Sequence, residues 1–140
     1  MKTLSDIKKI AVLGAGTMGP GIAQVFAMGG YQVTMWTRSE ATRNKAMATL
    51  RKGLETFVEE ELLEKDLLED VYSRVGFATT VEEAVQGADF IMETIVENKD
   101  AKAELYRQLD ACVGDGCIIA SNTSGLNIFE LVPPRRLPQT

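Results

Sequence analysis

Histidine is absent from this sequence, which removes the side chain that most often serves as general acid or base near neutral pH. Cysteine is scarce: Cys112 and Cys117 are the only two, and their spacing matches no zinc or redox motif. The sequence also lacks an apolar run of about 20 residues, the length that a membrane-spanning helix needs. These absences predict a reduced, cytoplasmic protein that binds no metal and no membrane.

Composition and charge are those of an ordinary globular domain. The 140 residues are 45% hydrophobic and 25% charged, and one domain of this size buries about two-thirds of its unfolded surface. The net charge of −5 argues against nucleic acid as a partner. Acidic side chains concentrate between Glu55 and Asp70, a stretch that we interpret as a solvated helix face.

Apolar stretches typical of strands alternate along the chain with segments of helical periodicity. Strands are expected at residues 7–13, 32–36, 75–78, 90–96 and 117–120. Helices are expected from about residue 22 to a stop at 29–30, at 40–61, 66–72, 80–87 and 102–111, with a capped turn at 127–130. Residues 135–140 are expected to lead into a further strand. Such alternation predicts an α/β fold, a doubly wound parallel sheet flanked by helices.

A GxGxxG motif follows the first expected strand and opens the helix after it. Its glycines are Gly14, Gly16 and Gly19, and Thr17 and Met18 stand between the last two. In this context the first glycine allows a tight turn, the second lets the backbone approach a pyrophosphate, and the third permits close helix packing. The positive end of the helix would face the phosphates. The motif therefore predicts a dinucleotide-binding Rossmann domain over residues 1–140, and a glycine-rich turn without a ligand is the alternative.

The end of the second expected strand should distinguish NAD from NADP. An acidic residue there would bind the ribose 2′-hydroxyl of NAD, whereas an arginine favours the 2′-phosphate of NADP. The chain has Trp36-Thr37-Arg38-Ser39, and no acid precedes Glu40. Arg38 can pair with a phosphate, helped by the hydroxyls of Thr37 and Ser39. The pattern favours NADP over NAD, and an ordinary surface arginine is the alternative interpretation of Arg38.

Three motifs in matching order make the chain resemble the N-terminal domain of the 3-hydroxyacyl-CoA dehydrogenase family. They are residues 10–19 with their continuation 21–24, residues 93–98 and residues 120–124. The resemblance covers almost the whole chain. It implies an oxidoreductase that transfers a hydride between NAD or NADP and a 3-hydroxyacyl-CoA, and a homodimer for the full-length protein.

The resemblance also implies roles for four residues that lie after the fourth and fifth expected strands. Glu97 matches a glutamate at the nicotinamide-side ribose, and Lys102 matches a lysine among the cofactor contacts. Asn122 matches a residue that shapes the nicotinamide pocket. Ser124 matches the catalytic serine that hydrogen-bonds the substrate's 3-hydroxyl or 3-keto oxygen, where charge develops during hydride transfer. A helix N-terminal charge for Glu97 and turn hydrogen bonds for Asn122 and Ser124 are the alternatives.

Several features depart from the family pattern. Family members use a histidine oriented by a glutamate, and both would fall beyond the position that matches Thr140. The chain is therefore expected to be a part of a longer enzyme, without its final strands and helical dimerisation domain, and to be inactive alone. Thr37 stands where NAD-using members usually have Asp, and the acidic stretch 53–61 stands where CoA-binding members carry a basic helix. A hydroxy acid without CoA is thus an alternative substrate, and a stand-alone NAD(P)-sensing module is the alternative function.

Overall fold

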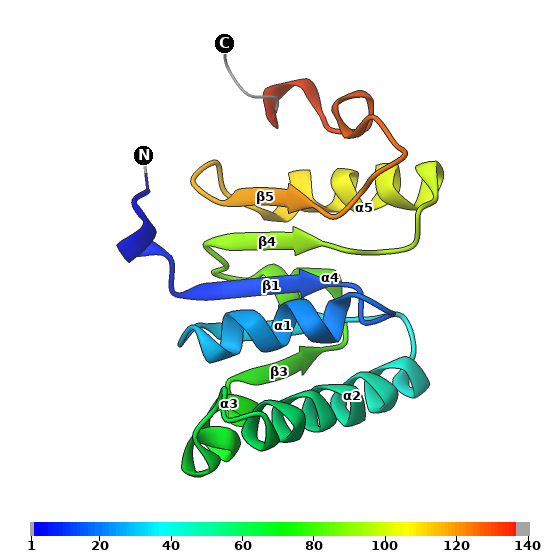
Figure 1. Ribbon diagram of the computed structural model, residues 1–140. Helices are drawn as coiled ribbons and strands as arrows, with labels where there is room; N and C mark the ends of the chain where they lie inside the picture. The colour runs from blue at the N-terminus through cyan, green and yellow to red at the C-terminus, as the bar shows by residue number, and fades with distance from the viewer. Residues whose placement is uncertain (1, 137–140) are drawn as a thin grey trace.

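Five strands form one parallel sheet in the computed structural model, which describes residues 2–136 (Figure 1). They are β1 (Lys9–Leu13), β2 (Gln32–Trp36), β3 (Val75–Ala78), β4 (Phe90–Glu93) and β5 (Ile118–Ser121). Their order in the sheet is β3-β2-β1-β4-β5, and every neighbouring pair is parallel. The chain moves from β1 outward to β3 and then crosses back to β4 on the other side of β1. This confirms the predicted doubly wound Rossmann arrangement, with its switch point between β1 and β4.

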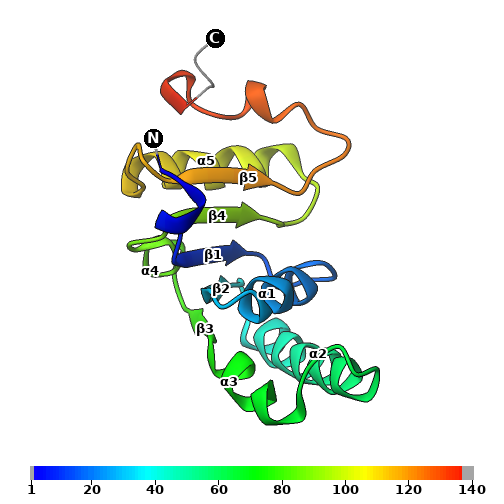
Figure 2. The same ribbon diagram turned by 60° about the vertical axis from the view of Figure 1, so that its left-hand side comes forward.

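Helices cover both faces of the sheet, as Figure 2 shows. They are α1 (Gly19–Met28), α2 (Glu40–Glu59), α3 (Leu68–Ser73), α4 (Val81–Val85) and α5 (Lys99–Cys112), with short 3-10 turns at Leu4–Asp6, Lys65–Leu67, Ile128–Glu130 and Pro134–Arg136. One apolar cluster joins the sheet to α1, α2 and α3, and a second joins it to α4 and α5. The sheet therefore lies between two separate hydrophobic layers.

Strand β1 is the centre of both layers. Ile10 and Val12 belong to the cluster under α1, whereas Ala11 and Leu13 belong to the cluster under α5. None of the four is more than 1% exposed. Because successive side chains of a strand point to opposite faces, a strand covered on both sides has to be apolar at consecutive positions. Within the stretch 7–13 where a strand was expected, residues 10–13 are thus buried on both faces of the sheet.

The predicted end of the fourth strand was wrong, because β4 ends at Glu93 and not at residue 96. Glu93 pairs with Leu13, the last residue of β1, and the chain beyond Leu13 turns away at Gly14 with φ of 118°. The residues after Glu93 therefore form a loop. That loop ends at Asn98, whose side chain accepts a hydrogen bond from the backbone of Ala101 and starts α5 three residues earlier than expected.

Local stop and start signals place most of the other boundaries. Thr80, the first residue of the helix expected at 80–87, caps α4, since its hydroxyl accepts a hydrogen bond from the Glu83 backbone at 3.1 Å. The Glu83 carboxylate accepts a further hydrogen bond from the backbone of Thr79 at 3.1 Å. Gly30, with φ of 94°, follows the end of α1, and Glu61, with φ of 58°, follows α2, which ends at Glu59.

The last part of the described chain forms two short turns. Asn127 caps the first of them as predicted, and its side chain accepts a hydrogen bond from the Phe129 backbone at 3.2 Å. The expected lead into a further strand falls partly on residues 137–140, which lie outside the described residues. Between residues 2 and 136, no helix combines the length and apolar character needed to cross a membrane.

Candidate functional site

A cleft of about 500 Å³ opens beside the carboxyl ends of the strands. The arrowheads of β1, β4 and β5 point toward this edge of the sheet in Figure 1. The cleft is lined by loops that follow four different strands: Gly14, Ala15, Gly16, Thr17, Met18, Trp36, Thr37, Arg38, Thr94, Ile95, Val96, Glu97 and Asn122. Open α/β sheets bind their ligands at such a position, outside the switch point. Eight of the predicted site residues lie together here, whereas Gly19, Lys102 and Ser124 lie outside the lining.

The three motif glycines have different structural roles in the loop after β1. A Cβ atom on Gly14 would lie 2.6 Å from the carbonyl oxygen of Thr94, and one on Gly19 would lie 2.1 Å from the carbonyl oxygen of Gly14. These two glycines therefore allow close backbone approaches. No atom lies within 4 Å of the Cβ position at Gly16, so that the backbone there is open to the cleft. An open backbone at this point is what a pyrophosphate requires.

The start of α1 adds to this phosphate-binding geometry. Met18 is the N-cap residue of α1 and makes no side-chain capping hydrogen bond, and a proline occupies the first turn. The first N–H groups of a helix have no partner within the helix, and the helix dipole is positive at this end. The loop and α1 thus present an anion-binding surface to the cleft.

Residues after β2 form one end of the cleft. Thr37 and Arg38 line it, and Arg38 is exposed. The Ser39 hydroxyl accepts a hydrogen bond from the backbone of Thr42 and caps α2. Ser39 is therefore engaged in the helix cap, and Arg38 and Thr37 remain as the groups available to a phosphate.

Loops after β4 and β5 meet at the other end of the cleft. Glu97, whose side chain is 43% exposed, accepts a short hydrogen bond from the Thr123 hydroxyl and lies 3.8 Å from the Lys102 ammonium. The hydrogen bond from Thr123, followed by the charge of Lys102, holds the pKa of Glu97 below its usual value. Asn122 donates to the Thr94 hydroxyl at 3.3 Å. An ionised carboxylate therefore faces the cleft from a loop that is tied to its neighbour.

Two predicted residues lie away from the surface of the cleft. Lys102 is completely buried, and its ammonium donates to a carboxylate oxygen of Glu93 at 2.6 Å. Ser124 lies in the exposed loop after β5, two residues beyond Asn122. The structure thus places Lys102 behind the wall of the cleft and Ser124 at an exposed position outside the cleft lining.

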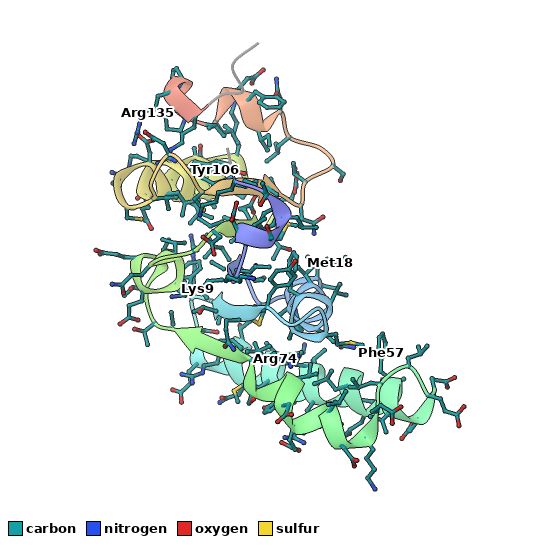
Figure 3. All side chains as sticks on the ribbon, turned by 90° about the vertical axis from the view of Figure 1, so that its left-hand side faces the viewer. Lys9, Met18, Phe57, Arg74, Tyr106 and Arg135 are labelled. Carbon is teal, nitrogen blue, oxygen red and sulfur yellow. The ribbon has the colours of Figure 1, made fainter. Side chains whose placement is uncertain are left out.

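A buried group around Glu93 was missed from the sequence. The Glu93 carboxylate also accepts hydrogen bonds from Tyr106 at 3.0 Å and from Ser121 at 2.5 Å. Burial, more than any other influence, raises the pKa of Tyr106. Figure 3 shows Tyr106 on α5, near the C-terminal segment that carries Arg135. An acid in the middle of the strand expected at residues 90–96, with a lysine and a tyrosine four residues apart on the next helix, was the available signal.

The family model for the NAD-binding domain of 3-hydroxyacyl-CoA dehydrogenase matches residues 9–139. The chain belongs to this family. The matched family model is that of a domain that binds a nicotinamide dinucleotide. The resemblance predicted from the three sequence motifs is confirmed.

Individual relatives support the same assignment. A probable 3-hydroxybutyryl-CoA dehydrogenase of Bacillus subtilis is 37% identical over 134 residues, which make up 96% of this chain and 46% of the relative. A 5-formyl-3-hydroxy-2-methylpyridine 4-carboxylate 5-dehydrogenase of Mesorhizobium japonicum is 38% identical, over 89% of this chain and 40% of the relative. The crystal structure of (S)-3-hydroxybutyryl-CoA dehydrogenase from Ralstonia eutropha matches with a TM-score of 0.83 at 35% identity, over 89% of this chain and 44% of that chain. The chain spans about half the length of the curated relatives it matches.

Proposed function

We propose that this chain is the cofactor-binding half of a dehydrogenase that transfers a hydride between a nicotinamide cofactor and a 3-hydroxyacyl-CoA or a related 3-hydroxy acid. The observation that carries the proposal is the convergence of the glycine loop, Arg38 and Glu97 on one cleft of about 500 Å³. These three features correspond to the pyrophosphate, the adenosine ribose and the nicotinamide ribose of a dinucleotide. The sequence contains no histidine, so the acid and base of the reaction would come from outside this chain.

Each end of the cleft has a defined role in this proposal. The backbone at Gly16 and the start of α1 bind the pyrophosphate. Glu97 accepts hydrogen bonds from the hydroxyls of the nicotinamide ribose, and Asn122 shapes the pocket for the ring. The bound cofactor supplies or accepts the hydride, and Ser124 donates a hydrogen bond to the substrate oxygen on which charge develops. A stand-alone sensing module would use the same cleft and leave Ser124 without a role.

A hydroxy acid without CoA is the second candidate substrate. Glu55, Glu59, Glu60 and Glu61 are all exposed at the C-terminal end of α2, the region that Phe57 marks in Figure 3. This acidic surface would repel the polyphosphate of CoA. A relative at 38% identity is named for a pyridine carboxylate and not for a CoA ester. A homodimer for the full-length protein and a cytoplasmic location stay predictions.

NADP is the preferred cofactor in this proposal because Arg38 is the charged residue that lines the adenosine end of the cleft. The first acid after β2, Glu40, lies exposed in the first turn of α2. A guanidinium can form paired hydrogen bonds with a 2′-phosphate, which a ribose hydroxyl cannot match in strength. Thr37 can add a hydroxyl to the same phosphate.

Calorimetric titration of the chain with NADH and NADPH tests this proposal. We expect NADPH to bind about tenfold more tightly than NADH, and Arg38→Ala to abolish that difference, because charge-assisted hydrogen bonds contribute roughly 1.5–3 kcal/mol. Arg43→Ala is the matched control: Arg43 is exposed on α2 and stacks on Phe77 at 5.3 Å, outside the cleft. Tighter binding of NADH would overturn the preference for NADP, and binding of neither cofactor would overturn the proposed function.

A further inference from the structure

Glu93, the last residue of β4, carries a completely buried carboxylate that is fully hydrogen-bonded. One oxygen accepts from the Lys102 ammonium at 2.6 Å and from the Ile95 backbone at 2.8 Å. The other accepts from the Tyr106 and Ser121 hydroxyls at 3.0 and 2.5 Å. A buried ion pair loses the hydration of both groups, so it is often no more stabilising than apolar side chains of similar volume. Stability alone therefore gives little reason for a charged pair at this position.

Three of the groups that contact Glu93 either line the cofactor cleft or lie next to residues that line it. Ile95 lines the cleft, and Ser121 is followed in the chain by Asn122, which lines it too. The Lys102 ammonium has Glu93 on one side and a Glu97 oxygen on the other, at 3.8 Å. The Glu93 carboxylate thus fixes a positive charge behind Glu97 and also holds the ends of the two loops that form this side of the cleft.

We propose that Glu93 is a positioning residue for cofactor binding: it holds the Lys102 ammonium behind Glu97 and, through Ser121, the loop that carries Asn122. The inference rests on the proposed function, because this arrangement matters only when a nicotinamide dinucleotide occupies the cleft. An ionised, fixed Glu97 accepts hydrogen bonds from ribose hydroxyls more strongly than a neutral or displaced one. Lys102, which does not line the cleft, acts on the cofactor through Glu97.

The charge of Lys102 also accounts for part of the low pKa of Glu97, after the hydrogen bond from Thr123. Loss of the lysine charge would therefore let Glu97 take up a proton at higher pH. A merely structural ion pair would not connect the pH dependence of cofactor binding to Lys102. The pH dependence of cofactor binding therefore distinguishes a positioning role of the Glu93–Lys102 pair from a merely structural one.

A double variant, Glu93→Gln with Lys102→Met, tests the inference. Each single substitution leaves one buried charge without its partner and is expected to destabilise the fold, whereas the double variant removes both charges at similar volume and is expected to fold. We expect the double variant to bind NADH and NADPH about tenfold more weakly than the wild type. We also expect the acid limb of its pH profile, the range in which affinity falls as Glu97 is protonated, to move to higher pH, because the Lys102 charge no longer lies beside Glu97.

Asp89→Asn is the matched control, because Asp89 is a carboxylate at the amino end of the same strand, remote from the cleft lining. This control should lose stability and keep the wild-type affinity and pH profile. A folded double variant with wild-type affinity and an unchanged acid limb would overturn the inference and leave Glu93 a structural residue. A wild-type chain that binds neither cofactor would instead overturn the proposed function, and this inference with it.

Ser121→Ala provides a second test that leaves every charge in place, should the double variant not fold. It removes the hydrogen bond from the Ser121 hydroxyl to Glu93, which helps to hold the start of the loop after β5 in place. We expect the affinity for both cofactors to fall about threefold with no shift of the acid limb. Unchanged affinity in this variant would contradict the positioning role.

Discussion

At the scale of single residues, Gly14 and Gly16 of the glycine loop differ in the space around them. Gly14 has φ of 118°, and a Cβ atom there would meet the Thr94 carbonyl oxygen at 2.6 Å. We therefore expect Gly14→Ala to lower the free energy of unfolding by at least about 2 kcal/mol, from backbone strain and the displaced neighbour. Urea denaturation of the variant beside the wild type measures this loss. A variant as stable as the wild type would show that the loop relaxes without cost.

Gly16 is the internal comparison, because the space around its Cβ position is empty to 4 Å. We expect Gly16→Ala to keep the stability of the wild type within about 0.5 kcal/mol. The added methyl group would occupy the space in which a pyrophosphate approaches the backbone, so the affinity for the cofactor should fall about tenfold. Denaturation and calorimetric titration on the same sample separate the two effects. Undiminished affinity would show that the pyrophosphate binds elsewhere.

At the scale of an element, Asp89 fixes the start of β1 against β4. Its carboxylate accepts hydrogen bonds from the Lys2 ammonium at 2.5 Å and from the backbones of Lys8 and Lys9 at 2.9 and 3.0 Å. The bond from Lys2, followed by the two backbone bonds, holds the pKa of Asp89 far below its usual value. A carboxylate with a lowered pKa stabilises the fold above its ordinary pKa, and this contribution is lost as the pH falls below that value.

Asp89→Asn should therefore cost roughly 1–2 kcal/mol of stability at neutral pH. The difference from the wild type should narrow from about pH 4 downward, as the carboxylate becomes protonated in the unfolded chain, and should disappear only below the lowered pKa of the folded state. Urea denaturation across this range measures the difference, with Asp115→Asn as a control at a side chain that is 89% exposed. A cost that stays constant down to strongly acidic pH would mean that the charge of Asp89 contributes nothing.

At the scale of the whole molecule, the described sheet has two edge strands, β3 and β5. Strand β5 is the last strand of the five, and its Ile118 is 45% exposed. An apolar edge strand presents unpaired backbone groups to a second chain. We expect this chain to associate as its concentration rises and Ile118→Lys to suppress the association. Gln32→Lys, at an exposed position of the inner strand β2, is the control. Light scattering that shows a monomer at every concentration would contradict the prediction.

Much of this molecule is determined by local sequence. The consecutive apolar residues of β1, the glycine loop after it and the capping residues Thr80 and Asn127 act over a few positions, so the sequence predicted the element order, the doubly wound sheet and most of the cleft residues. Arg38 and Glu97 could be placed in one cleft because parallel strands bring their carboxyl ends to one edge. Family motifs added proposed roles that local patterns do not specify.

Other features were decided only by the tertiary structure. Strand β4 stops at Glu93 because its neighbour β1 stops at Leu13, and no pattern within residues 90–96 contains that information. Ser39 caps α2 and is not free for a phosphate. The burial of Lys102 depends on Glu93, which lies on another element nine positions away, and on the packing of α5 over β4 and β5. Strand length and buried charge both depend on partners distant in the sequence, and only the packed molecule brings those partners together.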